Sequence, residues 1–275
     1  MIRLLLSSTA LATLMAGGPA LAADHAVKAP MFAKAPLVRV FSWTGFYFGG
    51  NAGGHWGQDN IATTTNVPNF GLASATNIDL ASPTKIKPTG WLAGVQAGYN
   101  VQVNHAVLGF EGDADWVNGS ASRSLVFPGP NPAAGDTLSN TTQANFLATL
   151  RPRLGAAFDH SLLYITGGLA VGTVKTTDSM TTFGGTVFES TSNTATRIGW
   201  VARGGFEYAF TDNWSAKVEA LHVDLGGTYD TGIPCAAGCT AGAATDIVVH
   251  HKYTDNIARF GINYRFGAAP VVAKY

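Results

Sequence analysis

Hydrophobic and polar residues alternate with a period of two along eight separate segments of the chain. From Gly90 to Val103, apolar residues such as Trp91, Val95 and Val101 hold the odd positions, while Gly, Gln and Asn hold most even positions. Successive side chains of a β-strand point to opposite faces of the sheet, whereas a helix would scatter both sets around its circumference. The pattern therefore predicts strands.

The eight predicted strands share one uniformly apolar face and one face of charges, amides and glycines. They cover residues 43–56, 90–103, 106–117, 143–158, 162–174, 196–210, 214–225 and 256–266. Each is long enough to cross a bilayer, since a tilted strand needs about 9–11 residues. Spanning strands must close on themselves, because open edges leave unpaired backbone groups in hydrocarbon. The prediction is an all-β fold, an eight-stranded antiparallel transmembrane β-barrel.

A soluble β-sandwich or a lipocalin-like barrel also shows alternation, and it is the alternative to a membrane barrel. Two features favour the membrane. The charges share a face with Gly and amides, as a narrow polar interior requires, and Trp, Tyr and Phe lie near the ends of the apolar strand faces, as interfacial girdles do. No segment is apolar over the length that a transmembrane helix needs.

The connections between these strands alternate in length. Short links lie at residues 104–105, 159–160 and 211–213, and long links at 57–89, 118–142, 175–195 and 226–255. Barrels of this kind have short periplasmic turns and long extracellular loops. We therefore expect both ends of the barrel domain in the periplasm and the long links outside the cell.

The N-terminus has the pattern of an export signal. Arg3 supplies a positive charge, Leu4–Met15 is a short apolar region, and Ala20, Leu21 and Ala22 form a small-x-small cleavage site. A membrane anchor is the alternative, but Gly17-Gly18-Pro19 interrupts the run before it is long enough. We predict a signal peptide at 1–22, a periplasmic linker at 23–42, the barrel at 43–266 and a tail at 267–275.

The composition of the chain limits the classes of partner that it can be expected to bind. The chain carries 17 Lys and Arg against 17 Asp and Glu, which gives no argument for nucleic acid binding. Only 12% of residues are charged, against roughly 25% in soluble domains. A surface facing outer-membrane lipid and lipopolysaccharide would account for that low value. No Gly-x-Ser-x-Gly elbow, P-loop or His-Glu-x-x-His occurs, so we expect no enzyme and no cofactor.

Charged residues of both signs fall on the inward face of the predicted barrel. They are Glu111, Asp113, Asp115, Arg151, Arg153, Arg203, Glu207, Lys217, Glu219 and Arg259. Eight strands enclose an interior that side chains can just fill. We expect structural ion pairs there, and an open pore is the alternative.

Two cysteines, Cys235 and Cys239, lie in the last long link. An exported chain can form and keep disulfides, so we expect a small loop clip. A metal site with His250 and His251 is the alternative, although this spacing does not match the usual zinc patterns. His250 and His251 are expected in a solvated loop.

Three motifs carry a family resemblance. Trp43-Thr44-Gly45-Phe46-Tyr47-Phe48-Gly49-Gly50-Asn51-Ala52-Gly53 resembles the first strand of the RopB-like outer membrane immunogenic proteins of α-proteobacteria, distant relatives of the OmpA barrel. Residues 213–219 and 260–266 are similar to that group's seventh and eighth strands.

The resemblance implies that the barrel-assembly machinery recognises a terminal aromatic residue. Residues 267–275 follow Phe266 here, so Phe266 or Tyr275 would be that signal. His222 is a second departure, because it stands where the group often has an outward aromatic residue. Similar proteins include haemin binders, which leaves His250 and His251 as possible ligands of haem iron.

These observations together predict a protein of the Gram-negative outer membrane that supports envelope integrity and presents surface loops. A porin-like channel for small solutes or ions is the first alternative. Binding of haem or host surfaces through the loops is the second.

Overall fold

The structure is a computed structural model, and it describes residues 41–65, 72–81, 84–127, 135–181, 184–234 and 245–266. The predicted signal peptide, the predicted linker up to residue 40, the predicted tail and both cysteines lie outside the described residues.

Eight antiparallel strands pair side by side and close into a barrel. They are β1 (Gly45–Thr65), β3 (Thr89–Val103), β4 (Ala106–Val126), β5 (Thr137–Phe158), β6 (Ser161–Thr181), β7 (Val187–Ala209), β8 (Trp214–Asp224) and β10 (Thr245–Phe266). The pairing of β1 with β10 closes the ring. The predicted closed antiparallel β-barrel is confirmed.

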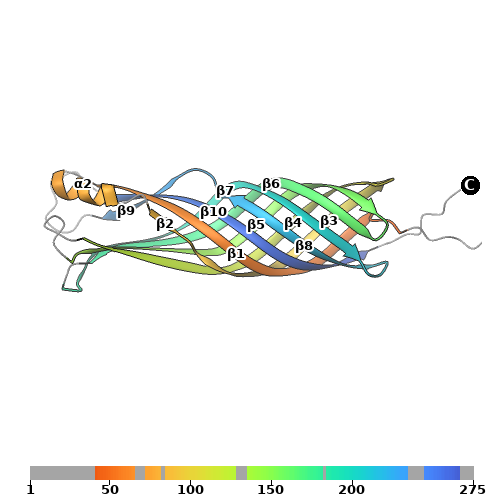
Figure 1. The fold of residues 1–275 in the computed structure, drawn as a ribbon, viewed down its shortest axis with the longest axis horizontal. Coiled ribbons are helices and arrows are strands. Elements are labelled where there is room, and N and C mark those ends of the chain that lie inside the picture. The colour runs from red at the N-terminus through yellow and green to blue at the C-terminus, as the bar shows by residue number, and fades with distance from the viewer. Residues whose placement is uncertain are drawn as a thin grey trace, which may run out of the picture. The chain divides into compact units, whose positions relative to one another are not determined.

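Two shorter strands extend the ring at one end. β2 (Thr84–Ile86) pairs with β1 beyond the start of β3, and β9 (Tyr229–Pro234) pairs with β10 beyond the end of β8. α2 (Leu72–Ala81) lies at the same end of the barrel as β9 (Figure 1). We call this the loop end, and the opposite end the turn end. Among the described residues no helix is long and apolar enough to cross a membrane.

The strands run obliquely around the barrel (Figure 1). Paired residues, followed once around the ring from His55, lead back to Gly45 on the same strand; the intermediate residues are Ile257, Leu221, Arg203, Thr166, Arg153, Gly109 and Asn100. A shift of ten residues over eight strands corresponds to a tilt of about 45°.

The outward face carries a belt of large apolar side chains between two aromatic rings. The ring towards the loop end comprises Trp56, Trp91, Trp116, Phe146 and Trp200. The ring at the turn end comprises Phe46, Tyr99, Phe158, Tyr208, Phe210, Trp214 and Phe266. Trp56 and Phe46 are ten residues apart on β1, which corresponds to about 23 Å along the barrel axis for strands tilted at about 45° to it. That height matches the roughly 25 Å apolar band of membrane barrels.

The strands continue well beyond this belt, which corrects the predicted loops. Much of the predicted long links 57–89, 118–142, 175–195 and 226–255 is strand, and β7 reaches 23 residues. Outward residues change from apolar to Ser and Thr there, while inward residues such as Ile61, Leu138 and Val249 stay apolar. The predicted strands ended where their outward apolar residues end. The pairing continues beyond that point because β-branched Thr is also a good strand residue.

Tight turns join the strands at the turn end. Residues 104–105 and 159–160 are turns as predicted, and Asn104 and Asp159 both have a φ of 54°. Asn and Asp tolerate this left-handed conformation better than most residues, which explains their places in two-residue hairpin turns.

Candidate functional site: the charged lumen

All ten predicted lumen residues point inward and meet in one layer, which we call the central charge layer. It comprises Glu111, Asp113, Asp115, Arg151, Arg153, Arg203, Glu207, Lys217, Glu219 and Arg259. The exposed fraction of each is 6% or less. They come from β4, β5, β7, β8 and β10, and the period of two places each on the inward face of its strand.

Glu111 is one centre of this layer. Arg151 Nη2 lies 3.0 Å from Glu111 Oε1, and Lys217 Nζ lies 3.0 Å from Glu111 Oε2. Arg203 donates to the same carboxylate, and the Tyr47 hydroxyl donates to Oε2 at 2.6 Å. Glu111 therefore contacts side chains from four other strands.

Arg259 forms the second centre. Its guanidinium lies 2.5 Å from Asp113 Oδ2, 2.6 Å from Asp115 Oδ2 and, through Nε, 2.8 Å from Glu219 Oε2. Arg151 joins this centre to the first, because its Nη2 also lies 2.5 Å from Asp113 Oδ2.

Glu207 closes the layer towards the turn end. Arg153 donates to Glu207, the Ser215 hydroxyl donates to Oε1 at 2.5 Å, and Asn263 Nδ2 donates to Oε1 at 2.8 Å. The Arg153 guanidinium also stacks over the Tyr164 ring at 3.7 Å. Aromatic and amide groups thus fill the space that the ion pairs leave.

The central charge layer is balanced. Five acidic and five basic residues contribute one charge each, so the layer has a formal charge of zero. Burying an ion is expensive unless a partner and hydrogen bonds compensate it. Every acid here contacts at least one base, and Glu111 contacts four.

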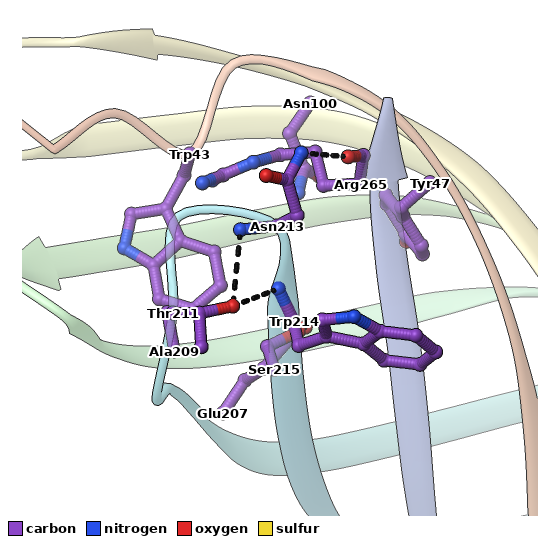
Figure 2. Close-up of a pocket in the computed structure, with 10 residues that line it drawn as sticks. All are labelled: Trp43, Tyr47, Asn100, Glu207, Ala209, Thr211, Asn213, Trp214, Ser215 and Arg265. Carbon is purple, nitrogen blue, oxygen red and sulfur yellow. Dashed lines mark hydrogen bonds between the residues drawn. The ribbon is translucent and has the colours of Figure 1, made fainter. Parts of the chain in front are cut away.

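The turn end is closed by a separate group of residues around Trp43, which is 2% exposed. The Trp43 backbone N–H donates to Gln102 Oε1 at 2.7 Å, and the indole N–H donates to the Asp159 carbonyl at 3.2 Å. Figure 2 shows Asn213 donating to the Arg265 carbonyl beside Trp43. The cavity between these residues is about 10 Å³, the size of one water site.

A second polar group lies nearer the loop end, beyond the membrane-spanning part, and we call it the outer polar layer. Its centre is His251, which is fully buried; Nδ1 lies 2.8 Å from Asp59 Oδ2 and Nε2 lies 3.3 Å from Asp178 Oδ2. The ring stacks on Tyr229 at 5.1 Å. Burial by itself would lower the pKa of His251. The two carboxylates stabilise the imidazolium by more than burial disfavours it, and they raise this pKa to about 9.

Apolar layers lie on both sides of the outer polar layer. Between it and the central charge layer, inward residues include Leu92, Val117, Leu147, Val201 and Leu221. Beyond it, towards the loop end, a second apolar cluster comprises Ile61, Ile78, Ile86, Phe127, Leu138, Met180, Ile233, Ile247 and Val249. Along the described part of the barrel, the lumen therefore alternates between charged and apolar packing.

Several predicted residues lie elsewhere than expected. His250 and His251 belong to β10, which corrects the predicted solvated loop; His250 faces outward beside Asp230, with Nδ1 2.5 Å from Oδ1. His251 has a carboxylate at each ring nitrogen, which leaves neither free for a metal. His222 lies on the outward face and packs against Trp200, with ring centroids 5.5 Å apart. His222 thus joins the aromatic ring at the loop-end side of the belt.

The outer polar layer was not predicted as a unit. Asp59 and Asp178 fell in predicted loops, and only the continued period of two would have placed them inside. Tyr47 and Tyr164 lie on the predicted polar faces, but their contacts with Glu111 and Glu219 depend on the barrel's closure. The predicted pair Cys235 and Cys239 lies outside the described residues and stays a prediction.

Comparison with known proteins agrees with this architecture. A family model for an outer membrane protein β-barrel domain matches residues 8–266. The chain is 31% identical over 249 residues to the 31 kDa outer-membrane immunogenic protein of Brucella melitensis, covering 90% of this chain and 93% of that protein. It is 28% identical to the 25 kDa outer-membrane immunogenic protein of Brucella abortus, covering 86% and 85%.

A third relative is the 22 kDa outer membrane protein of Rhizobium leguminosarum, which is 27% identical and covers 70% of this chain and 68% of that protein. The predicted resemblance and the predicted location are both confirmed. The chain belongs to the outer-membrane β-barrel family and, within it, to the outer-membrane immunogenic proteins of α-proteobacteria.

Proposed function

We propose that this protein is a closed, non-conducting structural barrel that supports the envelope and presents its loop end to the exterior, with no enzymatic activity. The observation that carries the proposal is the central charge layer. Ten buried charges sum to zero and pair across five strands, which ties the strands to one another through the middle of the barrel.

A porin-like channel is the competing function. A conducting lumen keeps charged side chains around water, where they are free to exchange ion pairs for hydration. Here Arg151 bridges Glu111 and Asp113, and Arg259 bridges Asp113, Asp115 and Glu219, so the bases span the bore from one acid to the next. These bridges favour a lumen filled by side chains rather than an open, water-filled pore.

Swelling of proteoliposomes in isosmotic sugar or salt solutions tests the proposal. Vesicles with the wild-type barrel should swell no faster than empty vesicles. The double variant Arg151→Ala/Arg153→Ala should swell measurably faster and also unfold at lower denaturant, because it removes two bridges and leaves Glu111, Asp113 and Glu207 short of partners.

Fast swelling with the wild-type protein would contradict the proposal and favour the channel. A double variant that changes ion preference while keeping full stability would do the same, since it would show that these arginines line water.

A further inference from the structure

The outward surface beyond the belt differs from one side of the barrel to the other. Over β4 to β7 it consists mainly of hydroxyl side chains that pair across strands, such as Ser122 with Thr141 at 2.9 Å and Ser124 with Ser139 at 2.8 Å. Over β2, β1 and β10 it carries three lysines, Lys85, Lys87 and Lys252, and all three are exposed. We call these three the lysine patch.

The register places the patch in one cluster. Lys252 and Lys85 both pair with Asn60, one from each side of β1. Neighbouring strands are about 4.8 Å apart, so their Cα atoms are about 10 Å apart across β1. Lys87 follows Lys85 by two positions and shares its outward side, because Ile86 between them is buried.

The patch also has a defined height above the belt. Lys87 lies four residues beyond Trp91, and Lys252 lies four residues beyond Asn256, the partner of Trp56. Four residues of a strand tilted at about 45° rise by about 10 Å. Trp rings mark the boundary between hydrocarbon and headgroups, so both lysines stand at the level of the headgroups of the surrounding leaflet.

We propose that the lysine patch binds a phosphorylated glycolipid headgroup of the outer leaflet. Ammonium groups are point donors that bind phosphate by charge-assisted hydrogen bonds, and two of them about 10 Å apart at Cα can converge on one headgroup. Between them, Gln58 and Asn60 add amide groups, joined by a Gln58 Nε2 to Asn60 Oδ1 hydrogen bond of 3.1 Å.

The nearby acidic residues do not neutralise the lysine patch. Asp224 Oδ2 lies 3.9 Å from Lys252 Nζ, a long contact between partly exposed groups, and the Lys252 side chain stays 51% exposed. Asp230 is engaged with His250. Lys85 and Lys87 have no carboxylate within 4.0 Å among the described residues. At least two of the three charges are therefore available to a ligand.

Native mass spectrometry of the refolded full-length barrel with added lipid A tests the proposal. The patch variant Lys87→Gln/Lys252→Gln keeps a polar side chain at each position and removes two charges from the exposed surface. The control variant Lys175→Gln removes one charge from the loop-end half of β6, on the opposite side of the ring from β1. A second arm uses wild-type protein with lipid A from which both phosphates have been removed.

We expect the patch variant to lose about 30-fold in apparent affinity for bisphosphorylated lipid A, since each lysine near an anionic surface contributes about fivefold. The control variant should change less than threefold, and the dephosphorylated lipid should bind the wild type as weakly as intact lipid A binds the patch variant. Equal losses in both variants, or equal binding of both lipids by the wild type, would overturn the proposal. The lipid arm decides even if a variant refolds poorly.

Discussion

Replacing Glu111 by Gln tests whether charge balance holds the barrel together. The substitution keeps the shape of the side chain and removes one negative charge, so the central charge layer changes from a formal charge of zero to +1. All four bases that contact Glu111 lose a carboxylate partner: Arg151, Arg153, Arg203 and Lys217. Removing one partner of a buried ion pair costs about 3–5 kcal/mol, and we expect Glu111→Gln to fall in that range.

The paired variant Glu111→Gln/Lys217→Met supplies the control. Lys217 contacts only Glu111 and Glu219 among the acids of the layer. When both groups are removed, Arg151 retains Asp113, and Glu219 retains Arg203 and Arg259. The layer is neutral again and each remaining charge has a partner, so the double variant should recover at least about 2 kcal/mol of the single variant's loss.

Urea titration of the barrels in phospholipid vesicles, followed by Trp fluorescence and by heat-modifiable gel mobility, measures these free energies of unfolding. The reasoning would be refuted if Glu111→Gln lost less than about 1 kcal/mol, because that would mean water already solvates the layer. It would also fail if the double variant were as unstable as the sum of the two single variants.

Three further predictions follow from the outward belt, the outer polar layer and the topology. Ala97→Arg places a charge on the lipid face and should cost about 2–4 kcal/mol, whereas Thr177→Arg, beyond the belt, should cost less than about 1 kcal/mol in the same urea titration; equal costs would contradict the assigned belt. The raised pKa of His251, about 9, means that its contribution to stability is complete below pH 6.5 and is lost as the pH rises through 9. The urea midpoint of the wild type should therefore fall between pH 7 and pH 10 more than that of His251→Gln, and parallel curves would refute the role of the imidazolium. With Cys235 and Cys239 replaced by Ser, cysteines at Ser122 or Ser179 should react with an impermeant thiol reagent on intact cells, and cysteines at Asn104 or Asp212 should not; the reverse pattern would invert the orientation.

The strands could be predicted because each carries its own evidence. In β3, Trp91, Val95 and Tyr99 alternate with Gln96 and Asn100, and a period of two needs no knowledge of the partner strands. The strand boundaries next to the tight turns were also predicted to within two residues, since Asn104 and Asp159 are local turn signals.

The outer half of the barrel could not be predicted from outward hydrophobicity. Residues such as Thr177 and Ser192 face water above the belt, so they resemble loop residues although they pair across β6 and β7. The contacts between lumen side chains could not be predicted for a different reason. Sequence places Glu111 and Arg203 on inward faces, but only the ten-residue shift around the ring determines that they meet.

Single-channel recording in planar bilayers tests the central claim most directly. Purified wild-type barrel, inserted in 1 M KCl and held at moderate voltage, should show no steady conductance above the bare bilayer. The Arg151→Ala/Arg153→Ala barrel should show openings under the same conditions. A steady open level in the wild type, with an unchanged open level and a shifted cation-to-anion permeability ratio in the variant, would contradict the closed barrel and establish a water-filled pore.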